Sequence, residues 1–360
     1  MATGLNLDLP GPELTALICD IPSVSGDETA LADAVELALR SYPHLHVDRN
    51  GDAVIARTRL GRSERVIVAG HLDTVPIARN LPTRWKGDVL WGRGTVDMKG
   101  GVAVALRIAA HVDRPVRDVT YVFYDHEEVE AARSGLARIV RDNPEWLAGD
   151  FAVLMEPTSG QVEGGCNGTL RAEVTVRGRA AHSARPWMGS NAVHAAGDIL
   201  DKLRSYVPAE IDVDGLVYRE GLNAVEIRGG IAGNVIPDTC VVTVNYRFAP
   251  SRGEDEAEKH VREIFGGYEV SVVDSAPGAL PGLGHPAAAA FVAAVGAEPR
   301  PKYGWTDVAR FSGLGMPAVN YGPGDPNLAH ADDERVRVAE IEQCELRMRD
   351  WLAASEPGPD

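Results

Sequence analysis

The fold is decided by residues 65–73, which read RVIVAGHLD. The run over residues 65–70 is short and mostly apolar, and two ionisable residues, His71 and Asp73, follow it directly. A run of this length and composition is typical of a strand that is buried on both faces of a mostly parallel sheet. The stretch therefore predicts a central strand of an α/β sheet, with polar side chains placed where the strand ends.

Three further runs have the same form, a short apolar stretch rich in Val, Ile, Phe or Tyr that is followed by ionisable residues. They cover residues 119–124, 151–155 and 317–321. Helical patterns separate the runs, for example at residues 101–112 and 134–140. Open α/β sheets bind their ligands outside the carboxyl ends of the strands. We therefore expect the ionisable residues that follow the four runs to meet at one edge of one sheet.

The middle of the chain has a different pattern of polar and apolar residues. From about residue 170 to residue 274 it reads strand, helix, strand, strand, helix, strand, which is the order of the ferredoxin-like split motif. Its strands alternate polar and apolar residues, which predicts one solvated face. We therefore expect an inserted ferredoxin-like α+β domain over residues 168–276. Residues 1–167 and 277–360 would form the catalytic domain around it, because the histidine at position 330 must return to the same site.

Charge and composition narrow the classes of partner. The chain has 360 residues, 36 Lys and Arg against 52 Asp and Glu, and a formal net charge of -16. This surplus of acids argues against nucleic acid as a partner, whereas a small anionic substrate can still bind a local positive site. No apolar run approaches the roughly 20 residues of a membrane span, no signal peptide is visible, and the four scattered cysteines are expected to be reduced. We expect a cytoplasmic protein with no membrane partner.

His71 and Asp73 are two residues apart, so on an extended chain their side chains point to the same side. Asp73 can then accept a hydrogen bond from one imidazole nitrogen of His71, which fixes the tautomer and makes the other nitrogen a better metal ligand. By itself the pair has a simpler explanation, a histidine capped by a neighbouring carboxylate.

Further ionisable residues stand at corresponding places along the chain. They are Asp97 in the glycine-rich segment 92–101, Glu127 and Glu128 after the run at 119–124, Glu156 after the run at 151–155, and His330 in the loop after the run at 317–321. Each alone is ordinary, because a helix N-cap, a solvated acidic turn or a surface residue would explain it. Adjacent carboxylates at a buried strand end, however, become favourable when a cation lies between them. Their convergence at one sheet edge predicts a metal site.

Two histidines and three carboxylates are the right number of ligands for two divalent ions that share a bridge. Two ions of charge +2 facing three carboxylates leave +1, which a bridging hydroxide neutralises, and each ion reaches the four-coordinate geometry that zinc prefers. Two ions about 3.5–4 Å apart lower the pKa of the shared water and polarise a carbonyl together. One carboxylate is left over, and a glutamate beside that water can carry its proton to a leaving amine.

These segments resemble the zinc amidohydrolase family that includes acetylornithine deacetylase, succinyl-diaminopimelate desuccinylase, aminoacylase and the glutamate carboxypeptidases. The resemblance covers essentially the whole chain and implies a zinc exopeptidase-like catalytic domain with two Zn²⁺ per subunit, for which Co²⁺ can substitute. It implies that His71 and Glu156 bind one ion, that Glu128 and His330 bind the other, and that Asp97 bridges them. Glu127 would be the general acid/base and Asp73 the residue that orients His71. The inserted domain usually mediates dimerisation in this family, so we expect a homodimer.

The resemblance also implies substrate-binding residues. Residues 178–186 are similar to the family segment in which a histidine, here His182, reaches the active site of a neighbouring subunit and stabilises the oxyanion. Asn234 and Arg247 match positions that face the substrate, and Thr306 lies in a loop similar to one that binds a substrate carboxylate. Without the resemblance, His182 would be an ordinary loop histidine, and Arg247 would be a solvated or ion-paired strand residue.

Residues 124–130, 165–169 and 181–189 resemble in detail the corresponding segments of actinobacterial succinyl-diaminopimelate desuccinylases. This resemblance implies hydrolysis of the amide bond of N-succinyl-LL-2,6-diaminopimelate to succinate and LL-2,6-diaminopimelate, a step in lysine and cell-wall precursor biosynthesis. The proteobacterial form has an arginine pair where this chain has Cys166-Asn167, and Arg171, Arg179 or Arg185 could compensate.

Two alternatives stay open. The first is an N-acyl amino acid deacylase of the acetylornithine type, or a carboxypeptidase, with the same metal site and a different pocket. The second is a non-catalytic binding module, which would not need Glu127.

Overall fold

The computed structural model describes residues 4–353 and divides them into two compact units. The second unit comprises Gly165–Pro281 and Pro301–Ala309, and the first unit comprises the remaining described residues. Each unit has a hydrophobic core of its own.

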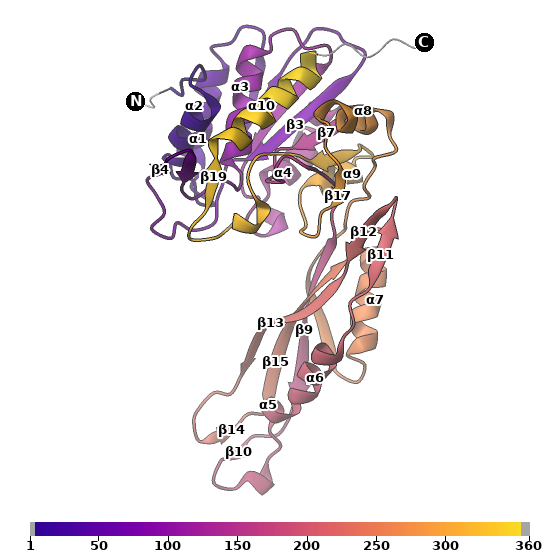
Figure 1. Cartoon of the computed structure of the whole chain (residues 1–360). Helices are drawn as coiled ribbons and strands as arrows, with labels where there is room; N and C mark the ends of the chain where they lie inside the picture. Colours follow the sequence, from indigo (N-terminus) through magenta and orange to yellow (C-terminus); the bar gives the residue numbers. More distant parts are fainter. Residues whose placement is uncertain (1–3, 354–360) are drawn as a thin grey trace. The chain divides into compact units, whose positions relative to one another are not determined.

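An eight-stranded sheet forms the centre of the first unit, with the order β1-β2-β6-β3-β7-β18-β8-β17 (Figure 1). Its strands are β1 (His46–Asn50), β2 (Ala53–Arg57), β3 (Arg65–His71), β6 (Asp118–Tyr124), β7 (Phe151–Leu154), β8 (Val162–Gly164), β17 (Pro299–Pro301) and β18 (Ala318–Asn320). The neighbours β6, β3, β7 and β18 are parallel to one another, and they contain the four apolar runs of the sequence. Strands β3 and β6 are buried along almost their whole length, as expected for strands covered on both faces. The predicted α/β class is confirmed.

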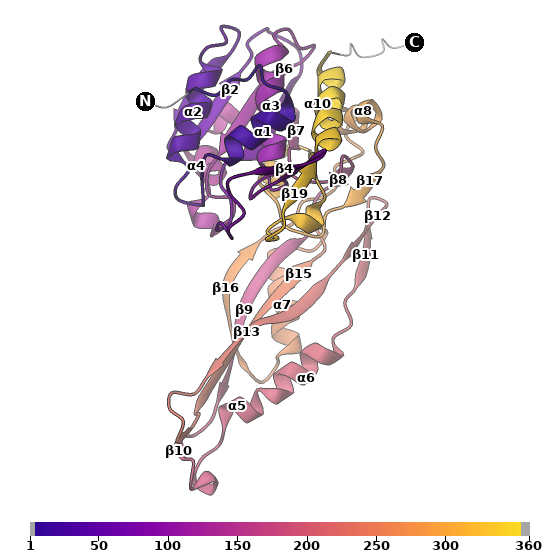
Figure 2. The ribbon, with the colours of Figure 1, turned by 60° about the vertical axis from the view of Figure 1, so that its left-hand side comes forward.

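Helices cover this sheet, as Figures 1 and 2 show. They are α1 (Gly11–Cys19), α2 (Thr29–Leu39), α3 (Lys99–His111), α4 (Gly135–Asp142), α8 (Pro286–Val295), α9 (Val308–Gly313) and α10 (Val338–Ala353). Helices α1, α3 and α10 contact one another, and their apolar residues share one core with the strands. A small three-stranded sheet, β19 (Arg335–Arg337), β5 (Val89–Trp91) and β4 (Arg84–Lys86), completes the unit. No helix within residues 4–353 combines the length and apolar character needed to cross a lipid bilayer.

Helix α3 lies very close to the end of β7. A Cβ atom on Gly101 would be 2.0 Å from the carbonyl oxygen of Met155, so only glycine permits this approach. The contact brings the loop that precedes α3 close to the residue that follows Met155.

A four-stranded antiparallel sheet, with the order β13-β15-β9-β16, forms the centre of the second unit. Its strands are β9 (Gly168–Arg177), β13 (Gly221–Gly229), β15 (Thr239–Phe248) and β16 (Glu269–Ala276), and its helices are α5 (Ala192–Ala195), α6 (Gly197–Ser205) and α7 (Glu254–Ile264). The predicted order of strands and helices is present, with the first predicted helix divided into α5 and α6. The sequence did not reveal the hairpin β11 (Glu210–Val213) and β12 (Leu216–Arg219), or the short pair β10 (Ala181–His182) and β14 (Val235–Ile236).

Candidate metal centre

The candidate metal ligands meet at the carboxyl edge of the four parallel strands. His71 is the last residue of β3, Glu128 follows β6, Glu156 follows β7, and His330 lies in the loop after β18. Asp97 lies just before α3. Because parallel neighbours end at the same edge of a sheet, residues far apart in the sequence come together there.

Asp97 is at the centre of this cluster. One of its oxygens, Oδ1, is 3.2 Å from Nε2 of His71, and the other, Oδ2, is 3.3 Å from Nε2 of His330. Nε2 of His330 is also 2.9 Å from Oε1 of Glu128. Asp97 belongs to two groups of possible ligands. One group contains His71 and Glu156, the other contains Glu128 and His330, and within each group the ligand atoms lie within 4.8 Å of one another. The pairing of ligands that the family resemblance implies is therefore compatible with the geometry.

The pKa values of the two histidines show that the acidic cluster favours positive charge at their positions. Burial opposes a charge on His71, but its polar contacts with Asp73 and Asp97 outweigh burial and raise its pKa well above 6.5. Hydrogen bonds to Asp97 and Glu128 raise the pKa of His330 to about 10. Divalent ions supply the same positive charge when they displace these protons. Two imidazoles and three carboxylates thus fit two divalent ions in both charge and donor chemistry.

The second imidazole nitrogen of His71 has a partner of its own. Nδ1 lies 2.9 Å from the backbone carbonyl oxygen of Asp73, and 3.5 Å from the carboxylate oxygen Oδ1 of the same residue. With the Nδ1 proton directed at this carbonyl, Nε2 keeps its lone pair for a metal. Asp73 therefore contacts His71 more closely through its backbone than through the side chain that the sequence singled out.

The Asp73 carboxylate instead holds the loop after β6. It is fully buried, its Oδ1 accepts the backbone N–H of Glu127 at 3.0 Å, and its Oδ2 accepts the N–H of Glu128 at 3.0 Å and the hydroxyl of Ser25 at 2.7 Å. Burial opposes ionisation of Asp73, but the nearby imidazole of His71 and the hydrogen bonds from Ser25 and from the backbone N–H of Glu127 lower its pKa to about 2. One carboxylate thus fixes the backbone of both glutamates.

Glu334 holds the Asp97 loop in the same way, and the sequence did not single it out. It is 1% exposed, and its Oε1 accepts the backbone N–H groups of Val96 at 2.9 Å and Asp97 at 3.1 Å. Its Oε2 forms an ion pair with Arg93 at 2.9 Å. Because Glu334 is only four residues after His330, it connects two ligand-bearing loops. Its position in a polar, acidic loop was the only signal for it in the sequence.

His182 and the four predicted substrate-binding residues belong to the second unit, where His182, Arg185 and Asn234 are neighbours. His182 is exposed, and its Nδ1 accepts the backbone N–H of Ala184 at 3.0 Å. Ser183 donates its N–H to the carbonyl oxygen of Asn234 at 2.9 Å, and Arg185 donates its N–H to that of His182 at 2.8 Å. The pairing of β10 with β14 brings these residues together.

The other two, Arg247 and Thr306, lie near Cys166. Burial lowers the pKa of Arg247, and its Nε donates to Oδ1 of Asn245 at 3.0 Å. Thr306 is buried, and its carbonyl oxygen is 3.7 Å from Sγ of Cys166. Asn167 donates its N–H to the carbonyl oxygen of Lys302 at 3.1 Å. Residues 301–309 thus pack around the Cys166-Asn167 segment.

Comparison with known proteins places this geometry in a family. The model of peptidase family M20/M25/M40 matches residues 67–353. A Mycobacterium tuberculosis protein named as a candidate succinyl-diaminopimelate desuccinylase DapE is 55% identical over 351 residues, which is 96% of this chain and 99% of that protein. The succinyl-diaminopimelate desuccinylase of Corynebacterium glutamicum is 47% identical over 96% of this chain and 98% of its own length.

Solved structures agree in fold at low sequence identity. A tripeptidase from Staphylococcus aureus has a TM-score of 0.79 at 17% identity and covers 97% of this chain and 98% of its own. A Bacillus subtilis protein described as a dinuclear metal-binding peptidase of the M20 family has a TM-score of 0.67 at 15% identity, over 95% of this chain and 96% of its own. The family and the ligand cluster together indicate a metal-dependent enzyme.

Proposed function

We propose a single reaction for this chain, which belongs to peptidase family M20/M25/M40. It hydrolyses the amide bond of N-succinyl-LL-2,6-diaminopimelate and releases succinate and LL-2,6-diaminopimelate. One observation supports the substrate above all: proteins named for this reaction are 55% and 47% identical to the chain along almost its whole length. The lysine and cell-wall precursor pathways would use the product.

We assign the metal ligands as two sets that share one residue. His71 and Glu156 hold one ion, Glu128 and His330 hold the other, and Asp97 bridges them, since each Asp97 oxygen faces a different histidine. Imidazole and carboxylate ligands suit Zn²⁺, and Co²⁺ accepts the same set. When bound, the two ions polarise the substrate carbonyl and lower the pKa of a water molecule.

Glu127 carries the proton in this scheme. Its carboxylate lies within 4.8 Å of ligand atoms of His71 and Glu128, but it is in neither of the groups that contain Asp97. A carboxylate in that position can take a proton from the attacking water and deliver it to the leaving amine nitrogen. Asp73 supports the transfer, because it holds the backbone N–H of Glu127.

The second unit recognises the substrate. Among residues 4–353, no carboxylate forms an ion pair with Arg247, although it is partly buried, so a substrate carboxylate is a natural partner for its guanidinium. Thr306, Asn234 and Arg185 complete the binding residues in this proposal. The His182 imidazole, exposed on β10, would stabilise the oxyanion of the partner subunit's site.

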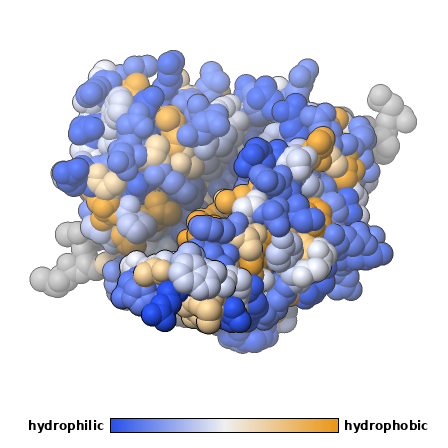
Figure 3. Space-filling view, turned by 90° about the horizontal axis from the view of Figure 1, so that it is seen from below, coloured by the Kyte–Doolittle hydropathy of each residue, from blue (hydrophilic) through white to orange (hydrophobic). Residues whose placement is uncertain are grey.

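A homodimer through the second unit supports this role of His182. Strand β13 is an edge strand, and its Val225 and Ile227 are 59% and 50% exposed. Ile231, just after β13, and Trp187, in the segment after β10, are exposed as well. Figure 3 shows apolar residues of this kind among a mostly hydrophilic surface. An exposed edge strand with apolar side chains favours pairing with a second copy.

The proposal is tested by metal analysis and a substrate panel. The purified enzyme is depleted with a chelator and reloaded with Zn²⁺ or Co²⁺, and the bound metal is counted. Turnover is then compared on N-succinyl-LL-2,6-diaminopimelate, N-acetylornithine and a dipeptide with C-terminal glutamate. We expect two ions per subunit and the highest kcat/KM on the succinyl substrate. A preference for N-acetylornithine or the dipeptide would contradict the proposed substrate, and metal-independent turnover would contradict the mechanism.

A further inference from the structure

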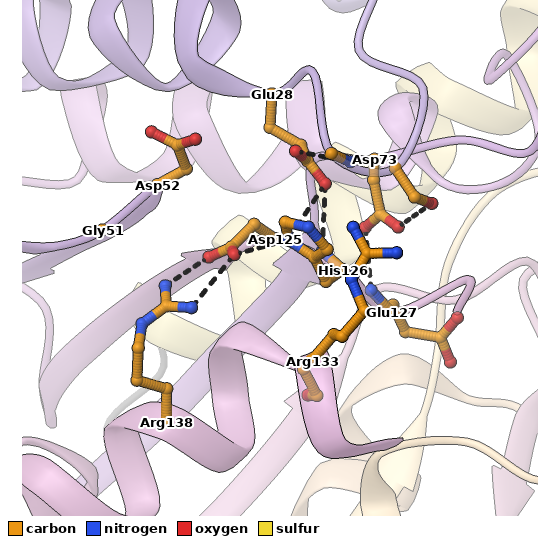
Figure 4. Close-up of polar contacts among 12 residues, drawn as sticks. Glu28, Gly51, Asp52, Asp73, Asp125, His126, Glu127, Arg133 and Arg138 are labelled. Atoms are coloured by element: carbon orange, nitrogen blue, oxygen red, sulfur yellow. Dashed lines mark hydrogen bonds and ion pairs between the residues drawn. The ribbon is translucent and has the colours of Figure 1, made fainter. Parts of the chain in front are cut away.

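Three consecutive backbone N–H groups converge on two buried carboxylates beside the metal centre. His126 donates to Oε1 of Glu28 at 3.2 Å, Glu127 donates to Oδ1 of Asp73 at 3.0 Å, and Glu128 donates to Oδ2 of Asp73 at 3.0 Å (Figure 4). Successive N–H groups around a left-handed residue form an anion-binding concavity. Here the protein fills that concavity with carboxylates of its own.

Glu28 comes from a distant part of the chain, and its side chain contacts Gly26 and His126. It precedes α2, and its side chain is fully buried. Its second oxygen, Oε2, accepts the N–H of Gly26 at 2.9 Å, while Oε1 is also 3.4 Å from Nδ1 of His126. A fully buried carboxylate is costly unless it is hydrogen-bonded, and the N–H groups of Gly26 and His126 offset that cost for Glu28.

The other side of the same turn is held by an ion pair. Arg138 contacts Asp125 with both terminal nitrogens, at 2.6 Å and 3.2 Å, and Asp125 also contacts Nδ1 of His126 at 2.7 Å. Arg138 is in turn anchored to the carbonyl oxygen and the side chain of Asn50. Figure 4 shows His126 between Glu28 and this pair.

The residue between the two anchors has a strained backbone. His126 has φ of 59°, in the left-handed region that residues other than glycine rarely adopt. Such a conformation persists only where its surroundings hold it. The dihedral angles of His126 set the direction in which Glu127 leaves the strand. Relaxation of this residue would therefore move the Glu127 carboxylate.

We propose that Glu28 is a positioning residue for proton transfer, because it holds His126 in the left-handed conformation that directs Glu127 toward the reacting water. This inference rests on the proposed role of Glu127. A general base must come within about 2.6–3.2 Å of the proton it transfers, so a small displacement has a large effect on rate. Glu128 is one residue further from His126, and its own N–H binds Asp73 at 3.0 Å, so metal binding is less sensitive to the change than turnover.

The test compares Glu28→Gln with a matched control, Glu345→Gln. Glu345 is a buried carboxylate of the first unit, 7% exposed and paired with Arg107 at 2.7 Å, away from this turn. For Glu28→Gln we expect full zinc occupancy, an unchanged KM and a kcat lower by a factor on the order of 10–100. The control should keep the wild-type kcat. Wild-type kcat in folded Glu28→Gln would overturn the proposal.

A double-mutant cycle separates positioning from general damage to the fold. If Glu28 acts through Glu127, then Glu28→Gln should have no further effect on the residual kcat of Glu127→Gln. A loss by the same factor in both backgrounds would overturn the proposal. Should Glu28→Gln not fold, Glu28→Asp keeps the charge and withdraws it by one methylene group. It should then lower kcat in the wild-type background only, and an equal loss in both backgrounds would again refute positioning.

The outcomes also distinguish this inference from the proposed function. Absence of desuccinylation by the wild-type enzyme would reject the proposed reaction, and full activity of zinc-loaded Glu127→Gln would reject the proton carrier. If the wild-type enzyme desuccinylates its substrate and Glu127→Gln is inactive, but the effects of the two substitutions are additive, only the role of Glu28 is rejected.

Discussion

Replacing Gly101 by alanine should separate two metal ligands without altering either of them. The added Cβ atom would lie 2.0 Å from the carbonyl oxygen of Met155, and real Cβ atoms essentially never approach closer than 3.0 Å. The nearest atom belongs to the backbone, so the helix or the strand end must move by about 1 Å. Asp97 lies just before the helix that carries Gly101, and Glu156 directly follows Met155. The shift therefore acts on the distance between these two ligands.

The magnitude follows from the tolerance of metal sites. Ligand distances in such sites hold to about 0.2 Å, so a displacement of about 1 Å is several times too large to be absorbed without rearrangement. We expect Gly101→Ala to lower zinc affinity by a factor on the order of 10–100. Overpacking should also lower the free energy of unfolding by about 1–3 kcal/mol.

The assay is a zinc titration against a competing chelator, together with thermal unfolding of the metal-free protein. Gly313→Ala is the matched control, because a Cβ atom on Gly313, in the same unit, has nothing within 4 Å. This control should bind zinc as the wild type does. If Gly101→Ala binds two zinc ions with wild-type affinity and unfolds at the wild-type temperature, the close approach of α3 to β7 does not control the ligand geometry.

Four further predictions concern the metal ligands, the proton carrier and His182. Glu127→Gln should keep both metals and lose turnover by a factor on the order of 10²–10⁴, measured by steady-state kinetics on the zinc-loaded variant; near-wild-type turnover would refute the assignment. Asp97→Ala should lose both ions together, and one full equivalent of zinc bound with unchanged affinity would mean that Asp97 does not bridge. His182→Ala should bind zinc, dimerise and lose activity by a factor on the order of 10²–10³. Mixed dimers of His182→Ala and Glu127→Gln should regain activity if the imidazole acts across the dimer, and no gain after confirmed subunit exchange would refute the cross-subunit role. The metal-free protein should lose stability as the pH rises from 6.5 to about 10, because the pKa of His330 is raised from 6.5 to about 10 and its contribution is complete only below the unfolded-state value. A flat melting temperature over this range, measured in the presence of a chelator, would contradict that sign, and His330→Gln should weaken the dependence to the part that comes from His71.

The central sheet could be predicted because its strands are marked by local composition. Residues 65–70 and 119–124 are apolar throughout most of their length, since strands β3 and β6 are buried on both faces. The position of the candidate ligands at strand ends was visible for the same reason. The hairpin of β11 and β12 carries no such signal, because its alternating residues are partly exposed.

The partners of the buried carboxylates could not be predicted. Asp73 stands two residues from His71, which pointed to a hydrogen bond between the two side chains, yet its carboxylate binds the N–H groups of Glu127 and Glu128. Glu28 and Glu334 bind N–H groups of residues 126 and 96–97 in the same manner. Glu28 precedes a helix, where a carboxylate is unremarkable in sequence terms.

Sequence by itself determined the kinds of chemical groups, which are two histidines and four carboxylates, and their order along the chain. His71 is at a strand end, and three of the carboxylates follow strands directly or within a few residues. Tertiary structure decided which oxygen faces which nitrogen, which loops share a carboxylate, and that residues 301–309 pack with the second unit. The physical reason is that side chains differ from residue to residue, whereas every residue except proline offers the same backbone N–H. A carboxylate that binds side chains can therefore be suspected from its neighbours in the sequence, and one that binds backbone N–H groups becomes visible only when the chain has folded around it.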